Sequence, residues 1–178
     1  MTTAANWAVT GSVQVNNGGT LTLSAYTVTI STGTTVSGTL NITSTTGTKN
    51  FSGLVTINSG GTWNNTINEA VTFAGDLVNN GTFNAGTAAQ TFSGTSKTIS
   101  GNVNIPRLTV SGTCTNNGTI NVSTVLAGTG ALTQGDNSVL NIGGTSTITT
   151  LNATNAENTV IYNSTGNQTA HVNSYYNL

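Results

Sequence analysis

The chain repeats a short pattern in which a polar residue, an apolar residue and usually an asparagine follow one another. The segment Thr82-Phe83-Asn84 shows this pattern, and its apolar position returns at a nearly constant interval along the chain. The apolar residues at this position are Leu21, Leu40, Trp63, Phe83, Val103, Ile120 and Leu140. A period of about 20 residues without helical signals is typical of a solenoid, whose successive coils stack around one long core.

Apolar and polar residues alternate around this position, as in a strand with one buried face. In most coils a second apolar residue follows two positions later, for example Leu23 after Leu21, whereas Asn65 breaks the pattern after Trp63. We therefore expect the apolar side chains to point inward and their polar neighbours to form a flat, uncharged outer face. The candidate interaction face comprises Thr20, Thr22, Thr39, Asn41, Thr62, Asn64, Thr82, Asn84, Asn102, Asn104, Thr119, Asn121 and Asn141.

A second pattern, an apolar residue followed by a small residue and a glycine, predicts the corners between strands. Its glycines are Gly11, Gly38, Gly53, Gly75, Gly94, Gly112 and Gly128. Because glycine adopts the positive φ angles that other residues avoid, we expect these glycines to turn the chain. Other apolar pairs, such as Val28 with Ile30, lie between the two patterns, so each coil should contain about three short strands.

These patterns together predict an all-β fold, a right-handed parallel β-helix (β-solenoid) with about 20 residues per coil. Residues 1–178 form a single solenoid domain of about eight to nine coils with a roughly triangular cross-section. At the usual strand spacing, such a stack is a rod of roughly 40 Å.

The composition agrees with this fold and excludes several functions. Only 4% of the residues are charged and 35% are hydrophobic, and the strand formers Thr, Val and Ile dominate while helix formers never recur at helical spacing. With only three lysines and arginines and a net charge of −1, the chain has no cluster of basic residues that could bind nucleic acid or an anionic membrane surface. No apolar run is long enough to span a membrane.

The few charged residues recur about one coil apart. Glu69 follows Lys49 by one period, and Lys97 follows Asp76 by one period and one position. We expect each pair to lie on adjacent coils at the surface, where an ion pair contributes at most about 1 kcal/mol and mainly fixes the register.

Four other polar or unusual residues allow separate predictions. Asp136 and Glu157 have the same charge and also lie about one period apart, so they either project into solvent or share a cation. Pro106 lacks a backbone donor and should lie at a strand end or corner. Cys114 occupies a position suited to an apolar residue, so we expect a buried and unreactive thiol.

Catalytic and metal sites lack the residues they need. Parallel β-helices do support hydrolytic and eliminative enzymes, and Glu69 and Asp76 are the only neighbouring acids, but each has a lysine one coil away. His171 has no cysteine, aspartate or second histidine nearby. The Gly-Gly-x-Gly-x-Asp repeat of calcium-binding β-rolls is absent, because Gly143-Gly144 continues without aspartate. We therefore expect no enzyme activity, no metal and no cofactor.

The segment QTFSGTSKTISG (residues 90–101), followed by LTVSG (residues 108–112), resembles the β-strand repeats of very large bacterial surface and secreted proteins. Residues 158–163 and 175–178 look like the same repeats. These proteins are similar in architecture to filamentous haemagglutinin and to autotransporter passenger stalks. The resemblance implies a right-handed parallel β-helix that extends an adhesin, coat or fibre away from the cell. It carries over no functional residue.

These observations predict a non-enzymatic, extracellular structural segment of a bacterial surface protein. Its partners would be copies of itself or flanking repeats, because we expect neither end of the solenoid to carry a polar cap. Both ends of the sequence suggest either a piece of a longer secreted protein or a mature subunit whose ends meet neighbours, and the beginning lacks the features of a signal peptide. The alternative is a binding module that uses the flat Thr/Asn face for ice or for a glycan.

Overall fold

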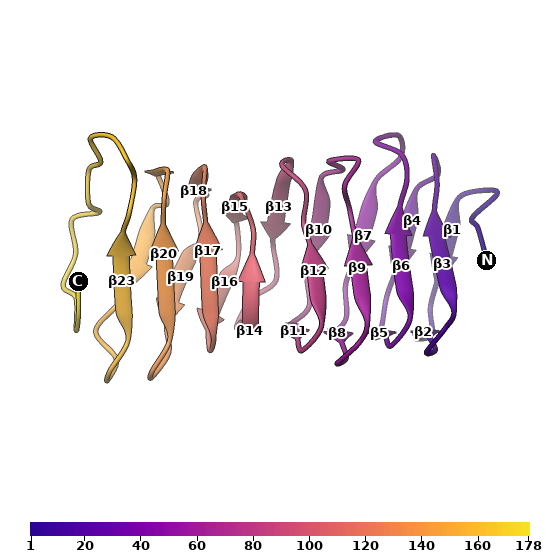
Figure 1. Cartoon of the computed structure of the whole chain (residues 1–178), viewed down its shortest axis with the longest axis horizontal. Coiled ribbons are helices and arrows are strands. Elements are labelled where there is room, and N and C mark those ends of the chain that lie inside the picture. Colours follow the sequence, from indigo (N-terminus) through magenta and orange to yellow (C-terminus); the bar gives the residue numbers. More distant parts are fainter.

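The protein is a β-solenoid, as the period of the sequence predicts. The structure, a computed structural model, describes residues 1–178 and contains 23 strands and no helix. Consequently no helix is present that could cross a lipid bilayer. As the chain advances along the axis, it rises along the front strands and descends along the rear strands, so the winding is right-handed (Figure 1).

Parallel strands from successive coils form three faces, which we number in the order in which each coil visits them. The first face contains β1 (Trp7–Val9), β4 (Val28–Ile30), β7 (Lys49–Phe51), β10 (Val71–Phe73), β13 (Ala89–Phe92), β15 (Arg107–Val110), β18 (Val125–Ala127) and β21 (Thr145–Ser146). The second face contains β2 (Val13–Val15), β5 (Thr34–Val36), β8 (Val55–Ile57), β11 (Leu77–Asn79), β14 (Lys97–Asn104), β16 (Thr113–Asn116), β19 (Ala131–Gln134) and β22 (Thr150–Asn152).

The third face is divided into two parts. The first part contains β3 (Thr20–Leu23), β6 (Thr39–Ile42), β9 (Thr62–Asn64) and β12 (Thr82–Asn84). The second part contains the end of β14 followed by β17 (Thr119–Val122), β20 (Val139–Ile142) and β23 (Thr159–Tyr162). With three faces and an 8-stranded first face, the solenoid has about eight coils of triangular section.

The repeated apolar position forms continuous files inside the solenoid. Leu21, Leu40, Trp63 and Phe83 are paired in register on the first part of the third face, and all are buried. On the second part the same position is occupied by Val103, Ile120, Leu140 and Val160, also buried. The predicted stacking is confirmed, and each such side chain contributes about 1.5–3 kcal/mol by leaving water.

Aromatic side chains fill the middle of this core. Phe51, Phe73 and Phe92 are in register on the first face, and their rings stack with centroids 5.8 Å and 5.0 Å apart. Trp63 packs against Phe51 from the third face at 4.9 Å, edge to face. The central coils are therefore held by contacts between faces as well as along the axis.

The corner glycines lie where the sequence predicts, but the expected reason is wrong. Of the seven, only Gly128 has a positive φ, 124°. At Gly53, Gly75 and Gly112 a Cβ atom would instead overlap backbone atoms of the coil beneath. Gly11, which belongs to the first coil, has nothing within 4 Å of that position. Glycine is required at these corners because successive coils approach too closely for a side chain.

The two ends of the solenoid differ, which corrects the prediction that neither is capped. Residues 163–178, which we call the C-terminal cap, extend across the last coils as an irregular segment (Figure 1). Gln168 Nε2 donates to the carbonyls of Ile142 and Gly144 at 2.7 and 2.6 Å, and Asn177 Nδ2 donates to another carbonyl at 3.1 Å. At the N-terminal end, β1 and β2 each have a strand on one side only.

Pro106 and Cys114 occupy the predicted places. Pro106 lies at the corner between β14 and β15. Cys114 is buried in β16 and is a free thiol. Burial, with a smaller contribution from the negative charge of Asp76, raises the pKa of Cys114 to about 11.

This raised pKa predicts a loss of stability in alkaline solution. A thiol whose pKa is higher in the folded protein stabilises the fold fully below its ordinary pKa of 9.0, and this contribution is lost as the pH rises through about 11. The melting temperature of the wild type should therefore fall more steeply above pH 9 than that of Cys114→Val. Parallel pH profiles of the two proteins would contradict the assignment.

Candidate interaction face

The predicted Thr/Asn residues lie on the outside of the third face. Each side chain is at least partly exposed and alternates with a buried residue of the core. Two columns run along β3, β6, β9 and β12. Beyond them, one column runs from the end of β14 through β17 and β20, and a second ends at Thr119, because Val139 follows it in register. The face is therefore uncharged and regular within each part.

The face is interrupted between β12 and β14, which was not predicted from the sequence. Leu77 and Ile99 are paired on the second face. Across the corner between the second and third faces, the chain takes six residues to go from Leu77 to Phe83. It takes only four residues to go from Ile99 to Val103. The shorter corner draws the end of β14 away from β12, so no ladder forms between these two strands on the third face.

Polar side chains partly fill this interruption. Asn79 Nδ2 donates to the carbonyl of Asn102 at 2.6 Å, so a side chain connects the two coils at the interruption. Beside it lies a shallow hollow of about 460 Å³, lined among others by Phe83, Asn84 and Asn104. The lining of the hollow includes the amides of Asn68, Asn84 and Asn104, while the Phe83 side chain is almost entirely buried.

Asparagine side chains on the face bind one another along the axis. Asn121 Nδ2 donates to Asn104 Oδ1 at 2.7 Å, and Asn141 Nδ2 donates to Asn121 Oδ1 at 2.7 Å. In the first part, Asn64 Nδ2 donates to Asn41 Oδ1 at 3.0 Å. These amides are neighbours across coils, so their hydrogen bonds connect successive coils and favour one register.

We expect Asn121→Ala to reduce the free energy of unfolding by about 1 kcal/mol, because it removes three cross-coil hydrogen bonds at a partly exposed site. Asn84→Ala is the matched control, since Asn84 occupies the same kind of outward position without a side-chain hydrogen bond. Urea unfolding of both variants measures the difference. Equal stabilities would show that the asparagine ladder contributes nothing.

Lys49 and Glu69 are neighbours on adjacent coils, as predicted, but they lie inside the solenoid. Lys49 Nζ is 3.9 Å from Glu69 Oε1, and the side chains are 0% and 6% exposed. Lys49 Nζ also donates to the carbonyls of Thr46 and Gly47 at 3.0 and 2.8 Å. Burial lowers the pKa of Lys49 and raises that of Glu69, and the attraction between them opposes both shifts.

Asn65 and Gln90 complete this buried polar cluster. Asn65 Oδ1 accepts from the Glu69 N–H at 2.9 Å, and Asn65 Nδ2 donates to the carbonyls of Glu69 and Ala85, both at 2.8 Å. Gln90 Nε2 donates to the same Glu69 carbonyl at 3.0 Å. The asparagine that interrupts the apolar alternation therefore binds the backbone of an irregular corner, which would otherwise be left unpaired in the core.

The predicted pairing of Asp76 with Lys97 is wrong. Asp76 Oδ1 accepts from the N–H and the hydroxyl of Thr98 at 2.7 and 2.9 Å. Because the register pairs Leu77 with Ile99, Thr98 lies beside Asp76 and Lys97 does not. Glu69 lies in the core while Asp76 binds an adjacent strand, so the two acids do not face a common cleft.

The remaining ionisable residues do not gather. Asp136 and Glu157 are both exposed, and His171 lies in the C-terminal cap with its Nε2 3.0 Å from the carbonyl of Ile148. Nowhere in the structure do three residues of the types His, Cys, Asp and Glu come together.

The first face carries hydroxyl columns that were not predicted from the sequence. Register aligns Thr29, Asn50, Thr72, Thr91 and Thr109 in one outward column. A serine follows two positions later in most of these coils, at Ser31, Ser52, Ser93 and Ser111. The sequence contained the information needed to predict these columns, because most of their residues flank the apolar residue of the corner pattern.

Comparison with known proteins identifies no relative: no protein-family model, curated protein or solved structure matches the chain. The solenoid architecture is seen directly in the structure, whereas the kinship with bacterial surface proteins stays a prediction.

Proposed function

We propose that this chain is a non-enzymatic structural segment of an extracellular bacterial surface protein, acting as a stalk or fibre-forming solenoid. The observation that carries the proposal is how the polar side chains are used. Asn121 and Asn141 bind the neighbouring coil, Asp76 binds an adjacent strand, and Lys49 and Glu69 pair inside the core. These groups connect coils to one another, which is what a load-bearing rod requires.

The extracellular location and the bacterial origin rest on the resemblance of residues 90–101 and 108–112 to surface-protein repeats. A rod of stacked coils serves to hold other segments at a distance. Its partners would be flanking repeats or further copies of the chain.

The experiment that tests this role combines location with binding. Antibodies against the solenoid should label the outer surface of intact producing cells. The purified protein should give no thermal hysteresis and no signal on a glycan array. Labelling confined to permeabilised cells would contradict the location, and a saturable signal in either binding assay would contradict a purely structural role.

The alternative is a glycan-binding module, and the hollow beside β12 favours it. Asn84 and Asn104 supply amides of the kind that bind sugar hydroxyls, whereas Phe83 is buried and contributes little exposed surface. If a glycan binds, Asn104→Ala should weaken binding while Asn41→Ala, on the uninterrupted part of the face, should not. Ice binding would instead use a regular hydroxyl array, such as the columns of the first face.

A further inference from the structure

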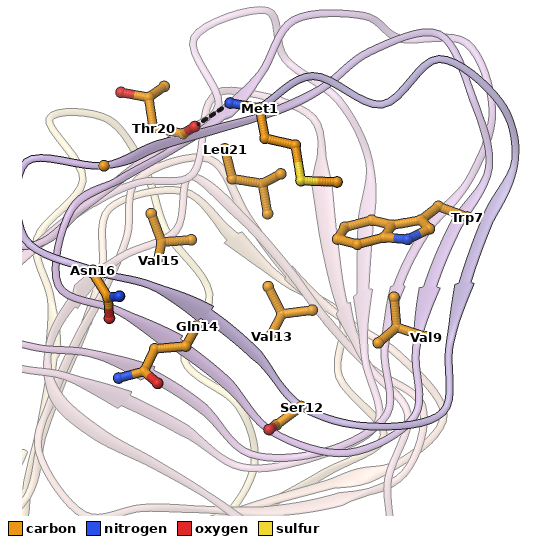
Figure 2. Close-up of a pocket in the computed structure, with 11 residues that line it drawn as sticks. Met1, Trp7, Val9, Ser12, Val13, Gln14, Val15, Asn16, Thr20 and Leu21 are labelled. Carbon is orange, nitrogen blue, oxygen red and sulfur yellow. Dashed lines mark hydrogen bonds between the residues drawn. The ribbon is translucent and has the colours of Figure 1, made fainter.

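The N-terminal end of the solenoid is an open edge lined by apolar side chains. Figure 2 shows Met1, Trp7, Val9, Val13 and Val15 around a hollow of about 420 Å³. Met1 is 77% exposed, and Trp7 and Val9 are half-buried. These are the inward positions that another coil covers everywhere else in the stack.

The backbone of β1 also has unpaired groups at this end. The Trp7 N–H donates to the carbonyl of Thr27, and the Val9 carbonyl accepts from the Ser31 N–H, each at 2.8 Å. In a parallel ladder the N–H and C=O of one residue point to the same neighbouring strand, and successive residues alternate. The N–H and C=O of Ala8 therefore face away from β4, toward the open end.

The same alternation applies to the other two faces. In β2, the bonds of Val13 and Val15 to the next coil leave the N–H and C=O of Gln14 toward the open end. On the third face, Thr2 is bridged to Thr22, and the bonds of that bridge involve the residues on either side of Thr2. Thr2 thus has a free N–H and C=O as well.

The three free edges form a ramp. Each coil advances by one strand spacing, about 4.8 Å, over three faces, so successive edges differ in height by about 1.6 Å. The segment around Thr2 is the outermost edge, β1 is in the middle and β2 is the innermost. A two-fold axis perpendicular to the solenoid, passing half a strand spacing outside the centre of β1, exchanges the outermost edge of one copy with the innermost edge of the other. A second copy related by this axis meets the first at one strand spacing on each of the three faces.

We propose that two copies of this chain associate through their N-terminal ends about such an axis. Ala8 would face the partner copy's Ala8, and each Thr2 would face a Gln14 of the other copy, in antiparallel pairs that exchange both backbone hydrogen bonds. All the free N–H and C=O groups of these three residues are then paired. Trp7 packs over Val9 of the other copy and closes the apolar hollow.

Charge and the far end of the molecule favour a second copy as the occupant. The chain has no charged side chain before Lys49, so two of these ends meet without repulsion between side chains. The Met1 ammonium group is bound to the carbonyl of Thr20 at 2.8 Å. At the opposite end the C-terminal cap covers the last coils, so association of this kind stops at a dimer, which fits the stalk of the proposed function and not a fibre.

A cysteine placed on the axis tests the geometry, using the full chain with no N-terminal tag. Facing residues of a hydrogen-bonded antiparallel pair have Cα atoms about 5.5 Å apart, within the range that a disulfide spans. Ala8→Cys should therefore form a disulfide-linked dimer under mild oxidation. Thr29→Cys is the matched control, because it is the next outward residue of the same column. Equal cross-linking of both variants would overturn the proposal.

Sedimentation equilibrium tests the association itself. The wild type should have twice the 17.9 kDa mass of one chain, and Ala8→Pro should sediment as a monomer with an unchanged circular dichroism spectrum. Proline is tolerated at Ala8 because its N–H makes no bond within the chain. A monomeric wild type would overturn the proposal, because the N-terminal edge would then be left to another partner. A series of larger oligomers would also overturn it, because such oligomers require an open C-terminal end.

This inference rests on one of the two kinds of partner named in the proposed function, further copies of the chain. Surface labelling tests where the protein is located, whereas sedimentation of the purified chain tests the dimer, so one result can fail without the other.

Discussion

Gly75→Ala is expected to destabilise the solenoid by about 3 kcal/mol or more, the upper part of the range for overpacked cores. A Cβ atom at Gly75 would overlap the backbone of Gly53 on the coil beneath. Backbone atoms held by ladders on both sides cannot move aside as a flexible side chain could. The expected result is a large fall in the denaturant midpoint, or failure to fold.

Gly11→Ala is the control for this substitution. Gly11 follows the same sequence pattern, but no coil lies beneath it and nothing is within 4 Å of its Cβ position. Its stability should stay within about 0.5 kcal/mol of the wild type. If both variants lose the same stability, the corners need glycine for its backbone freedom and close approach is not the cause.

Glu69→Ala is expected to destabilise the protein by about 3–5 kcal/mol, since it leaves the buried ammonium group of Lys49 without its counter-charge. Lys49→Met combined with Glu69→Leu removes both charges and fills similar volume. The double variant should recover most of the loss. Unfolding of the three proteins in guanidinium chloride gives the comparison. If Glu69→Ala is as stable as the wild type, the hydrogen bonds from Lys49 to the carbonyls of Thr46 and Gly47 are enough to stabilise its buried charge.

The pH dependence of these variants has a definite sign. A lysine whose pKa is lowered on folding contributes stability above its ordinary pKa of 10.5, and loses it as the pH falls through the lowered value. Without Glu69, the opposing attraction disappears and the pKa of Lys49 falls further. The loss of stability of Glu69→Ala relative to the wild type should therefore shrink as the pH rises toward 10.5. The double variant lacks Lys49, so its stability should not show the rise with pH that the lowered pKa gives the wild type.

The sequence was sufficient to predict the coils and the core. The regular period and the two-residue alternation are direct consequences of stacking and of strand geometry, so Leu21, Leu40 and Ile120 could be placed inside without coordinates. The outward orientation of the Thr/Asn residues follows from the same alternation. Whether that face binds anything stays a prediction.

Other features depend on what lies one coil away, which a single stretch of sequence does not show. The corner glycines are constrained by the coil beneath them and not by their own φ angles. A spacing of one period made Lys49 and Glu69 neighbours but did not show on which side of the strand they lie. The alternation could have done so, because Lys49 is two positions before Phe51, which points inward.

The interruption of the face and the C-terminal cap were missed for a related reason. A corner shortened by two residues shifts the register locally, and this appears in sequence only as a small irregularity in the period. The cap has no repeat at all, because its side chains bind carbonyls one by one.

The stack of coils also determines how the molecule comes apart. Since every strand pairs only with the coil before and the coil after it, loosening is a local event that must begin at a terminus. The uncovered first coil has ladder bonds on one side only, whereas the last coils are tied down by side chains. Amide hydrogens should accordingly exchange fastest near β1 and β2 and slowest around the phenylalanine column, so the rod frays in one direction.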